Sequence, residues 1–370
     1  MTATAPSASR CYDGASGGRV RITIDGLELD ADEGQTVLDV ARQAGIEVPT
    51  LCHDDRLKPA GACRMCLVEV EGQRRLQPSC AWQATDGMVV RTDSERVVKN
   101  RQMLLSLYVA DHPIDVDGQP TERGVGNQLR EQAATYGTGP VLPALPSQRA
   151  GRVDLNPYIH FEPSACIGCA ACVRYCDEVE GVSAIALVER GGEVTIGTAD
   201  QQGLLDSSCE LCGGCIAVCP TGAMTEKPSL GVPPAPEPVR STCNFCGVGC
   251  QVDLHVVDGR LSRVTSPPPG TTVNDGNLCV KGRFAMEFVH HDDRLTTPLV
   301  RDAAGVLQPA TWEEAIGAVA AGLLGVKERH GADALGFISS SRCTGEENYL
   351  MQKLSRAAFG TNNCHQCAAT

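Results

Sequence analysis

The sequence predicts an α+β protein of several small domains, and three observations support this. Its 370 residues correspond to about two to four domains of ordinary size. Aromatic residues make up only 4% of the chain, so the predicted cores are small. Twenty cysteines recur, most of them in short and regularly spaced groups, which indicates that bound metal supplies part of the stability.

Composition narrows the classes of protein to consider. The formal net charge of −13 disfavours binding to nucleic acid and to anionic membrane surfaces. The N-terminal residues contain no apolar signal-peptide core, and the sequence has no long apolar span. Clustered cysteines in such a chain are expected to be thiolate ligands in the cytoplasm rather than disulfides.

Two cysteine runs between residues 166 and 219 carry the clearest motif. Each has three cysteines at three-residue spacing and a fourth cysteine four residues later. In bacterial ferredoxins three thiolates of such a run bind one [4Fe–4S] cluster, and the fourth binds the neighbouring cluster. The predicted crossed sets are site 2, with Cys166, Cys169, Cys172 and Cys219, and site 3, with Cys176, Cys209, Cys212 and Cys215. Zinc spacings do not explain this doubled run, and the glycines at 168, 213 and 214 are expected to let the backbone approach the clusters.

The N-terminal part of the chain predicts a β-grasp ferredoxin domain. Residues 19–24 alternate like a strand, and residues 27–30 return after a turn. Thr36 and Asp39 form a predicted capping box, and the helix that follows is expected to end at Gly45. The next loop carries site 1, which comprises Cys52, Cys63, Cys66 and Cys80. Two thiolates for each iron suit a [2Fe–2S] cluster, although the first gap is longer than in plant-type ferredoxins.

A fourth cysteine motif follows a proline-rich stretch. Site 4 comprises Cys243, Cys246, Cys250 and the distant Cys279. A zinc ribbon also uses two separated cysteine groups, but three close cysteines and one distant cysteine fit it less well. Beyond this motif the sequence predicts the start of an α/β domain. Its expected elements are a helix over 312–330 with a capping box at Thr311 and Glu314, a strand over 334–338, and a helix over 346–359 ended by Gly360.

Several runs resemble known families. "GACRMCLVEVEG" resembles the G-type iron–sulfur subunit of NADH-quinone oxidoreductase. "CVKGRF" and "RLTTPLVR" resemble the N-terminal cluster domain of molybdopterin oxidoreductases, and "SSSRCTGEENYLMQKLSRAAFGTNN" resembles their formate dehydrogenase branch. The resemblance implies that Lys281, after the fourth cysteine of site 4, lies between cluster and pterin as an electron relay.

The resemblance to the G-type iron–sulfur subunit also implies a further [4Fe–4S] cluster that this chain lacks. In that family a histidine at the position of His112 begins a His-Cys-Cys-Cys motif. Here the family's first and last cysteines fall on about Val116 and about Asn127, and no cysteine occurs between Cys80 and Cys166. We therefore do not predict His112 as a ligand.

The formate dehydrogenase resemblance implies the N-terminal part of a catalytic subunit. Formate would lose two electrons and a proton at molybdenum or tungsten held by two pterin guanine dinucleotides. Electrons would pass through site 4, then the two ferredoxin clusters of sites 2 and 3, then site 1, to a flavin-bearing, NAD-linked partner subunit. Alternatives are a conduit like the G-type iron–sulfur subunit, without molybdenum, and a stand-alone electron carrier; an iron-only hydrogenase is disfavoured by the motif at Cys243.

The end of the chain gives one further expectation. In the resembled family Gly-Thr-Asn-Asn is followed by a short run and then by the Cys or selenocysteine that ligates the metal. Here Gly360-Thr-Asn-Asn363 precedes Cys364-His-Gln-Cys367-Ala-Ala-Thr370. We expect a catalytic subunit cut at a UGA selenocysteine codon, inactive towards formate alone, with exposed apolar surface on its last segment. A frameshift, a domain fragment and a short electron carrier are the alternatives.

The predicted domain boundaries follow from these motifs and from the Gly/Pro-rich stretches. They are a disordered tail (1–17), a [2Fe–2S] domain (18–93), a helical segment with a degenerate His-Cys motif (94–136), a linker (137–152), a double [4Fe–4S] ferredoxin domain (153–226), a Pro-rich linker (227–239), a molybdopterin oxidoreductase [4Fe–4S] domain (240–298) and the start of a molybdopterin-binding α/β domain (299–370).

Overall fold

The structure of the protein is a computed structural model. It describes residues 18–112, 126–143, 148–149, 154–232 and 234–367. The predicted N-terminal tail, Val116 and parts of the first linker lie outside the described residues.

The first domain confirms the predicted hairpin, helix and cysteine loop. Its strands are β1 (Arg19–Ile24), β2 (Leu27–Asp32), β3 (Leu67–Val70), β4 (Gln77–Pro78) and β5 (Val89–Arg91), in the sheet order β2-β1-β5-β3-β4. Strands β1 and β2 are antiparallel, and β1 pairs with β5 in parallel. Helix α1 (Val37–Gln43) starts at the predicted Thr36–Asp39 capping box, and its apolar face covers the sheet.

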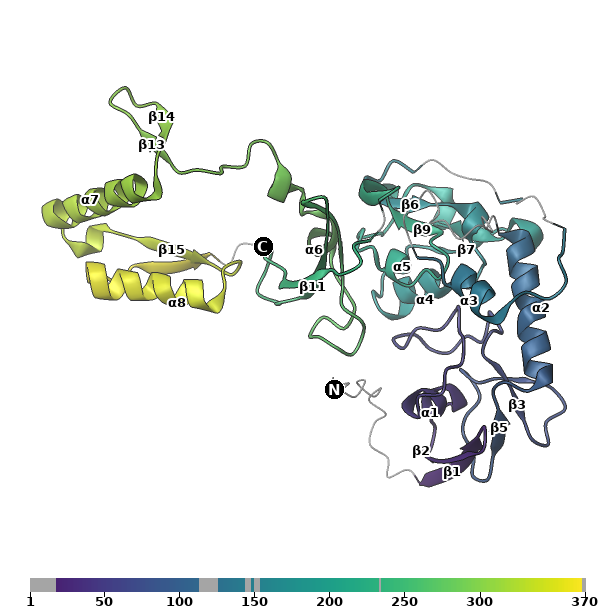
Figure 1. The fold of residues 1–370 in the computed structure, drawn as a ribbon. Coiled ribbons are helices and arrows are strands. Elements are labelled where there is room, and N and C mark those ends of the chain that lie inside the picture. The colour runs from purple at the N-terminus through teal and green to yellow at the C-terminus, as the bar shows by residue number, and fades with distance from the viewer. Residues whose placement is uncertain (1–17, 113–125, 144–147, 150–153, 233, 368–370) are drawn as a thin grey trace.

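A helical pair joins the first two domains. Helix α2 (Glu95–Asp111) starts at Ser94, whose side chain accepts a hydrogen bond from Val97, and helix α3 (Gln128–Tyr136) starts at Asn127. The two helices pack against each other beside the second domain (Figure 1). His112 lies at the end of α2 and is buried.

The second domain has the two-fold repetition that the paired cysteine runs predict. Strands β6 (Ile159–Phe161) and β9 (Met224–Glu226) are antiparallel, and so are β7 (Ala186–Val188) and β8 (Thr195–Gly197). Helices α4 (Ala171–Glu178) and α5 (Gly214–Ala217) follow the two cysteine loops and pack on each other.

The Pro-rich segment is packed rather than freely extended. Residues Lys227–Ser229 form a 3-10 turn, and the ammonium of Lys227 donates to the Asp154 carbonyl at 2.6 Å. Further along, the Arg263 guanidinium donates to the carbonyls of Ser229 and Val232. Proline cannot donate to a sheet, so these side-chain contacts hold the segment in place.

The third domain is a small antiparallel sheet with a short helix. Its strands are β10 (Val239–Thr242), β11 (Gln251–Val257) and β12 (Arg260–Thr265), in the order β10-β11-β12. Helix α6 (Val280–Phe284) packs against β12.

The last segment lies at the left of Figure 1 and confirms the predicted helices. Its elements are β13 (Leu299–Arg301), β14 (Leu307–Pro309), α7 (Trp312–His330), β15 (Phe337–Ser340), α8 (Gly345–Lys353), a π-helical turn (Leu354–Phe359) and β16 (Cys364–Cys367). Helix α7 starts at the predicted Thr311–Glu314 capping box, and Gly360 ends the second helix with φ +75°.

The predicted strand over 334–338 was wrong by three residues at its start. Residues Ala332–Ala334 form a 3-10 turn, and β15 begins at Phe337 in parallel with β16. The side-chain amide of Asn363 donates to the backbone carbonyls of Asp333 and Leu335. These carbonyls are therefore bound by a side chain and not by a neighbouring strand, and pairing with β16 begins only at Phe337.

Exposed apolar side chains gather on this last segment, as predicted. Trp312, Ile316 and Val319 on α7 are 70%, 62% and 61% exposed, and Ile338 on β15 is 70% exposed. No described residue of α7 or α8 is buried. Among the described residues, none of the helices combines the length and apolar character that a membrane span requires.

Candidate metal centres

Site 1 lies in the loops that follow α1 and flank β3 and β4. All four of its cysteines are at most 2% exposed. The structure pairs them: Cys52 hydrogen-bonds with Cys63, and Cys66 hydrogen-bonds with Cys80. The hydrogen bond with Cys63 lowers the pKa of Cys52 to about 5, and the hydrogen bond with Cys80 lowers the pKa of Cys66 to about 6. In each pair the other thiol, Cys63 or Cys80, has a raised pKa, so each pair favours one thiolate; four sulfurs arranged in two pairs fit a cluster with two sulfur ligands for each iron.

Site 2 surrounds a small cavity in the second domain. The cysteines that line it are Cys166, Cys169, Cys172 and Cys219. Cys219 comes from the end of the second cysteine run, 47 residues beyond Cys172 in the sequence. The structure therefore brings together the four residues that the crossed ferredoxin pattern groups as site 2.

Site 3 surrounds the neighbouring cavity. The cysteines that line it are Cys176, Cys209, Cys212 and Cys215. Cys172 and Cys176 are four residues apart on α4, yet each lines a different cavity. Met224 lines both cavities, so a single side chain lies between the two spaces.

The backbone around these cavities donates hydrogen bonds to sulfur. Gly168 donates to Cys166 and Leu211 donates to Cys209, both at 3.4 Å, and Ala184 donates to Cys176 at 3.2 Å. Such bonds stabilise thiolate ligands and tune cluster potentials. Burial opposes ionisation of the free thiols, because it raises the pKa of Cys169 to about 12. The positive charge of bound iron would stabilise the thiolate form of these buried cysteines, so this set of donors fits a cluster.

A single zinc ion fits the arrangement less well. Zinc holds sulfur at about 2.3 Å, so four ligands close on one point. The cysteines of sites 2 and 3 instead surround cavities, as ligands of a larger cluster do.

The glycines of the second run also make room for neighbouring side chains. A Cβ on Gly214 would overlap the Tyr175 ring, and a Cβ on Gly213 would overlap the Arg283 side chain. Gly213 also has φ +74°, where side chains other than glycine are strained. These glycines make room for two long side chains, whereas a Cβ on Gly168 would meet open space.

Site 4 lies in the third domain, between β10 and β11 and at the start of α6. The Cys243 amide donates to the Cys250 carbonyl at 2.8 Å, which closes the loop that carries three of its cysteines. Cys279 is the N-cap of α6, and a Cβ on Gly282 would lie 3.6 Å from the Cys243 sulfur. Burial, with the charges of the neighbouring thiols, raises the pKa of Cys243 and Cys250. Cys246 and Cys279 are exposed, and Lys281 is exposed on α6 beside them.

Direct contacts join site 1 to site 2. Cys52 and Cys63 belong to the same buried apolar cluster as Cys169. The Tyr108 hydroxyl donates to the Cys63 carbonyl at 3.1 Å, and the Arg174 guanidinium donates to the Cys52 carbonyl. Arg174 lies on α4, between two cluster cysteines, so α4 contacts both sites.

A second set of contacts joins site 3 to site 4. The Arg283 guanidinium on α6 donates through Nε to the Cys212 carbonyl at 3.0 Å. The next residue, Phe284, stacks on Tyr158 with ring centroids 4.6 Å apart. Sequence reasoning missed Arg283, Tyr108 and Arg174, because each acts on a backbone carbonyl far away in the chain and no local pattern marks such a contact.

The structure describes two positions of the His-Cys motif discussed above, His112 and Asn127. Asn127, the approximate position of the family's last cysteine, caps α3 by accepting from Arg130. His112 is buried at the end of α2, and the loop that would carry the other ligands falls outside the described residues.

Family models match four consecutive parts of the chain. They are a 2Fe-2S iron-sulfur cluster binding domain over residues 17–95, the ferredoxin-like domain of NADH-quinone oxidoreductase subunit 3 over 156–225, the molybdopterin oxidoreductase Fe4S4 domain over 237–291 and a molybdopterin oxidoreductase domain over 294–370. In this order, the chain therefore resembles the iron–sulfur and N-terminal molybdopterin domains that these models describe. These matches indicate both [2Fe–2S] and [4Fe–4S] clusters, and they confirm the predicted fold class.

Two proteins with similar sequences are oxidoreductase subunits. This chain is 40% identical over 349 residues to the NADPH-Fe(3+) oxidoreductase subunit alpha of Geobacter sulfurreducens, and it is 38% identical to a G-type NADH-quinone oxidoreductase subunit of Rhizobium meliloti. Each match covers 93% of this chain, which spans about 40% of the length of either relative. A putative formate dehydrogenase of Staphylococcus aureus is 28% identical over 397 residues, with 94% of this chain and 39% of that protein covered.

One solved structure is similar to part of the chain. The crystal structure of the NAD+-reducing [NiFe]-hydrogenase in the H2-reduced state contains a chain that is 30% identical, with a TM-score of 0.52. The match covers 60% of this chain and 91% of that chain.

Proposed function

We propose that this chain is the iron–sulfur electron conduit of a cytoplasmic, NAD-linked oxidoreductase. Site 1 would hold one [2Fe–2S] cluster, and sites 2, 3 and 4 would each hold one [4Fe–4S] cluster. The observation that carries the proposal is the continuity of the four sites through packed side chains: the apolar cluster that includes Cys63 and Cys169, then Met224, then Arg283. When bound, the clusters supply one-electron carriers.

The chain's own residues perform three tasks in this proposal. Cysteine thiolates hold each cluster, and backbone N–H groups such as that of Ala184 orient the sulfurs. Burial of Leu51, Leu57 and Met65 excludes water between sites 1 and 2. The Tyr108 hydroxyl and the Arg174 guanidinium hold the site 1 loop against the second domain through carbonyls of that loop.

The partner that we propose is a flavin and iron–sulfur subunit that exchanges electrons with a nicotinamide nucleotide. The names of the relatives support it, because one is an NADPH-linked oxidoreductase subunit and another is an NADH-quinone oxidoreductase subunit. The related hydrogenase is described as NAD+-reducing.

Formate is the substrate that we propose for the intact enzyme, with molybdenum or tungsten bound by two pterin guanine dinucleotides. Formate would give carbon dioxide, one proton and two electrons. Lys281 beside site 4, the resemblance of residues 339–363 and the putative formate dehydrogenase among the relatives support this. The higher identity to the NADPH-Fe(3+) and NADH-quinone oxidoreductase subunits favours the second candidate, a conduit of the G-type kind without a molybdenum centre.

The exposed apolar side chains of α7 and β15 fit a segment that packs against further parts of a molybdopterin oxidoreductase domain.

The formate proposal is tested on the intact protein purified without oxygen. Adding formate is expected to bleach the visible absorption of the iron–sulfur clusters, and oxidative extraction is expected to release a fluorescent pterin. Acetate, a carboxylate without a transferable hydrogen, is the matched control and should leave the spectrum unchanged. Reduction by NADH through the partner without any pterin would identify the G-type conduit instead.

A further inference from the structure

Arg283 is a buried arginine at the contact between the second and third domains. It is 4% exposed and lies on α6, four residues after the site 4 ligand Cys279. Its Nε donates to the carbonyl of Cys212, a residue of site 3, at 3.0 Å. A single side chain therefore connects the helix that follows site 4 to the loop that carries site 3.

The residues around Arg283 leave room for its side chain and hold its helix in place. A Cβ on Gly213 would overlap both the Arg283 chain and the Phe284 ring, so glycine at 213 permits the contact. Phe284 stacks on Tyr158 with an angle of 2° between the rings. Two neighbouring contacts thus hold α6 against the second domain: Arg283 beside Gly213, and Phe284 on Tyr158.

The Arg283 guanidinium lies against the loop of site 3: its Nε bonds to the carbonyl of the ligand Cys212, and its side chain passes Gly213 beside it. Its Nη2 atom is buried and has no hydrogen-bond partner among the described residues, so the carbonyl of Cys212 leaves part of the guanidinium unsatisfied. A positive charge in a site that excludes water acts more strongly than one at the surface.

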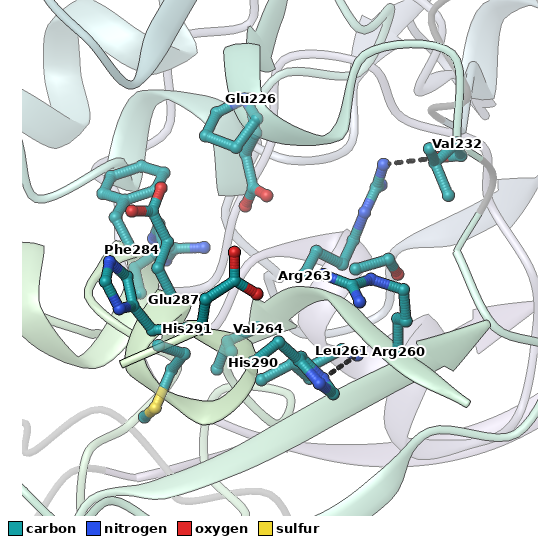
Figure 2. Close-up of a pocket in the computed structure, with 15 residues that line it drawn as sticks. Glu226, Val232, Arg260, Leu261, Arg263, Val264, Phe284, Glu287, His290 and His291 are labelled. Atoms are coloured by element: carbon teal, nitrogen blue, oxygen red, sulfur yellow. Dashed lines mark hydrogen bonds between the residues drawn. The ribbon is translucent and has the colours of Figure 1, made fainter. Parts of the chain in front are cut away.

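A countercharge lies nearby in a cavity of about 480 Å³ between the two domains. Glu226, 7% exposed, points its carboxylate towards this cavity (Figure 2). Burial raises the pKa of Glu226, while the charges of Arg283 and Arg263 lower it. Glu287, His290, His291 and Asp292 also line the cavity.

We propose that Arg283 is a positioning residue that raises the reduction potential of the site 3 cluster and holds site 4 against it. The proposal rests on the proposed function, because it requires a cluster in site 3. A [4Fe–4S] cluster becomes more negative when it accepts an electron, so a fixed positive charge beside it stabilises the reduced form. Site 3 would thereby attract electrons arriving from site 4.

The test is a redox titration of the anaerobically reconstituted full chain, followed by EPR. Arg283→Gln is expected to disfavour reduction of the site 3 cluster about tenfold, which is about 59 mV for one electron. Arg283→Lys keeps the charge and is expected to recover most of the shift. Arg260→Gln removes an exposed arginine at the rim of the same cavity and serves as the matched control, with no shift at site 3.

An Arg283→Gln chain that binds all its clusters with a site 3 potential unchanged, or raised, would overturn the inference. If that variant loses the cluster, Glu226→Gln decides the matter, because removal of the countercharge must raise the site 3 potential. A fall, or no change, in that variant would contradict the proposal. Absence of iron from site 3 in the unaltered chain would instead contradict the proposed function.

Discussion

Replacing Cys219 with alanine is expected to remove the cluster of site 2 and to leave that of site 3. Cys219 follows Cys215 by four residues, but it lines the other cavity, with Cys166, Cys169 and Cys172. The reconstituted variant should contain about four fewer iron atoms than the unaltered chain. Its EPR spectrum after reduction should match that of Cys169→Ala and differ from that of Cys209→Ala.

The reciprocal variant is the control. Cys176→Ala should give the spectrum of Cys209→Ala, because Cys176 lines the cavity of site 3. Both variants remove one thiol from the same small domain, so general damage would affect the two spectra alike. Loss of the site 3 signal in Cys219→Ala would show that each cysteine run binds its own cluster.

Substitution of Gly214 by alanine is expected to be severe. The added methyl group would overlap the Tyr175 ring, which is 1% exposed. The Tyr175 hydroxyl donates to Asn277 at 2.5 Å, and Arg56 lies 5.0 Å from the ring centroid, so this ring contacts the first and third domains. Displacing it should cost about 1–3 kcal/mol of stability and should release iron from site 3, as measured by thermal unfolding and iron analysis.

Gly317→Ala is the matched control for that change. Gly317 lies inside α7, is exposed, and has open space where a Cβ would be added. Alanine favours the helix there by about 0.5–1 kcal/mol, so the control should be slightly stabilised and keep all its iron. Equal stability and full iron content in Gly214→Ala would show that Tyr175 can move without cost.

The sequence predicted the features that depend on local chemistry. Cysteine spacing grouped the ligand sets, and the structure brings the members of sites 2 and 3 together around separate cavities. Capping boxes at Thr36 and Thr311 placed two helix starts, because the hydrogen bonds of a cap join residues three apart. Those interactions are complete within a few residues, so they can be recognised before the fold is known.

Features that depend on distant contacts could not be predicted. The bond from Arg283 to the Cys212 carbonyl spans 71 residues, and that from Tyr108 to the Cys63 carbonyl spans 45. An arginine in "CVKGRF" has no local sign that it is buried. The start of β15 was misplaced for the same reason, since the carbonyls of Asp333 and Leu335 bond to the side-chain amide of Asn363, about 30 residues away.

Iron analysis with EPR on the anaerobically reconstituted chain tests the central claim most directly. Four complete sets of ligands predict about fourteen iron atoms for each chain, with one [2Fe–2S] signal and three [4Fe–4S] signals after full reduction. A count near eighteen with a fourth [4Fe–4S] signal would show that His112 belongs to a cluster after all. Zinc bound in place of iron at any of the four sites would contradict the account of an electron conduit.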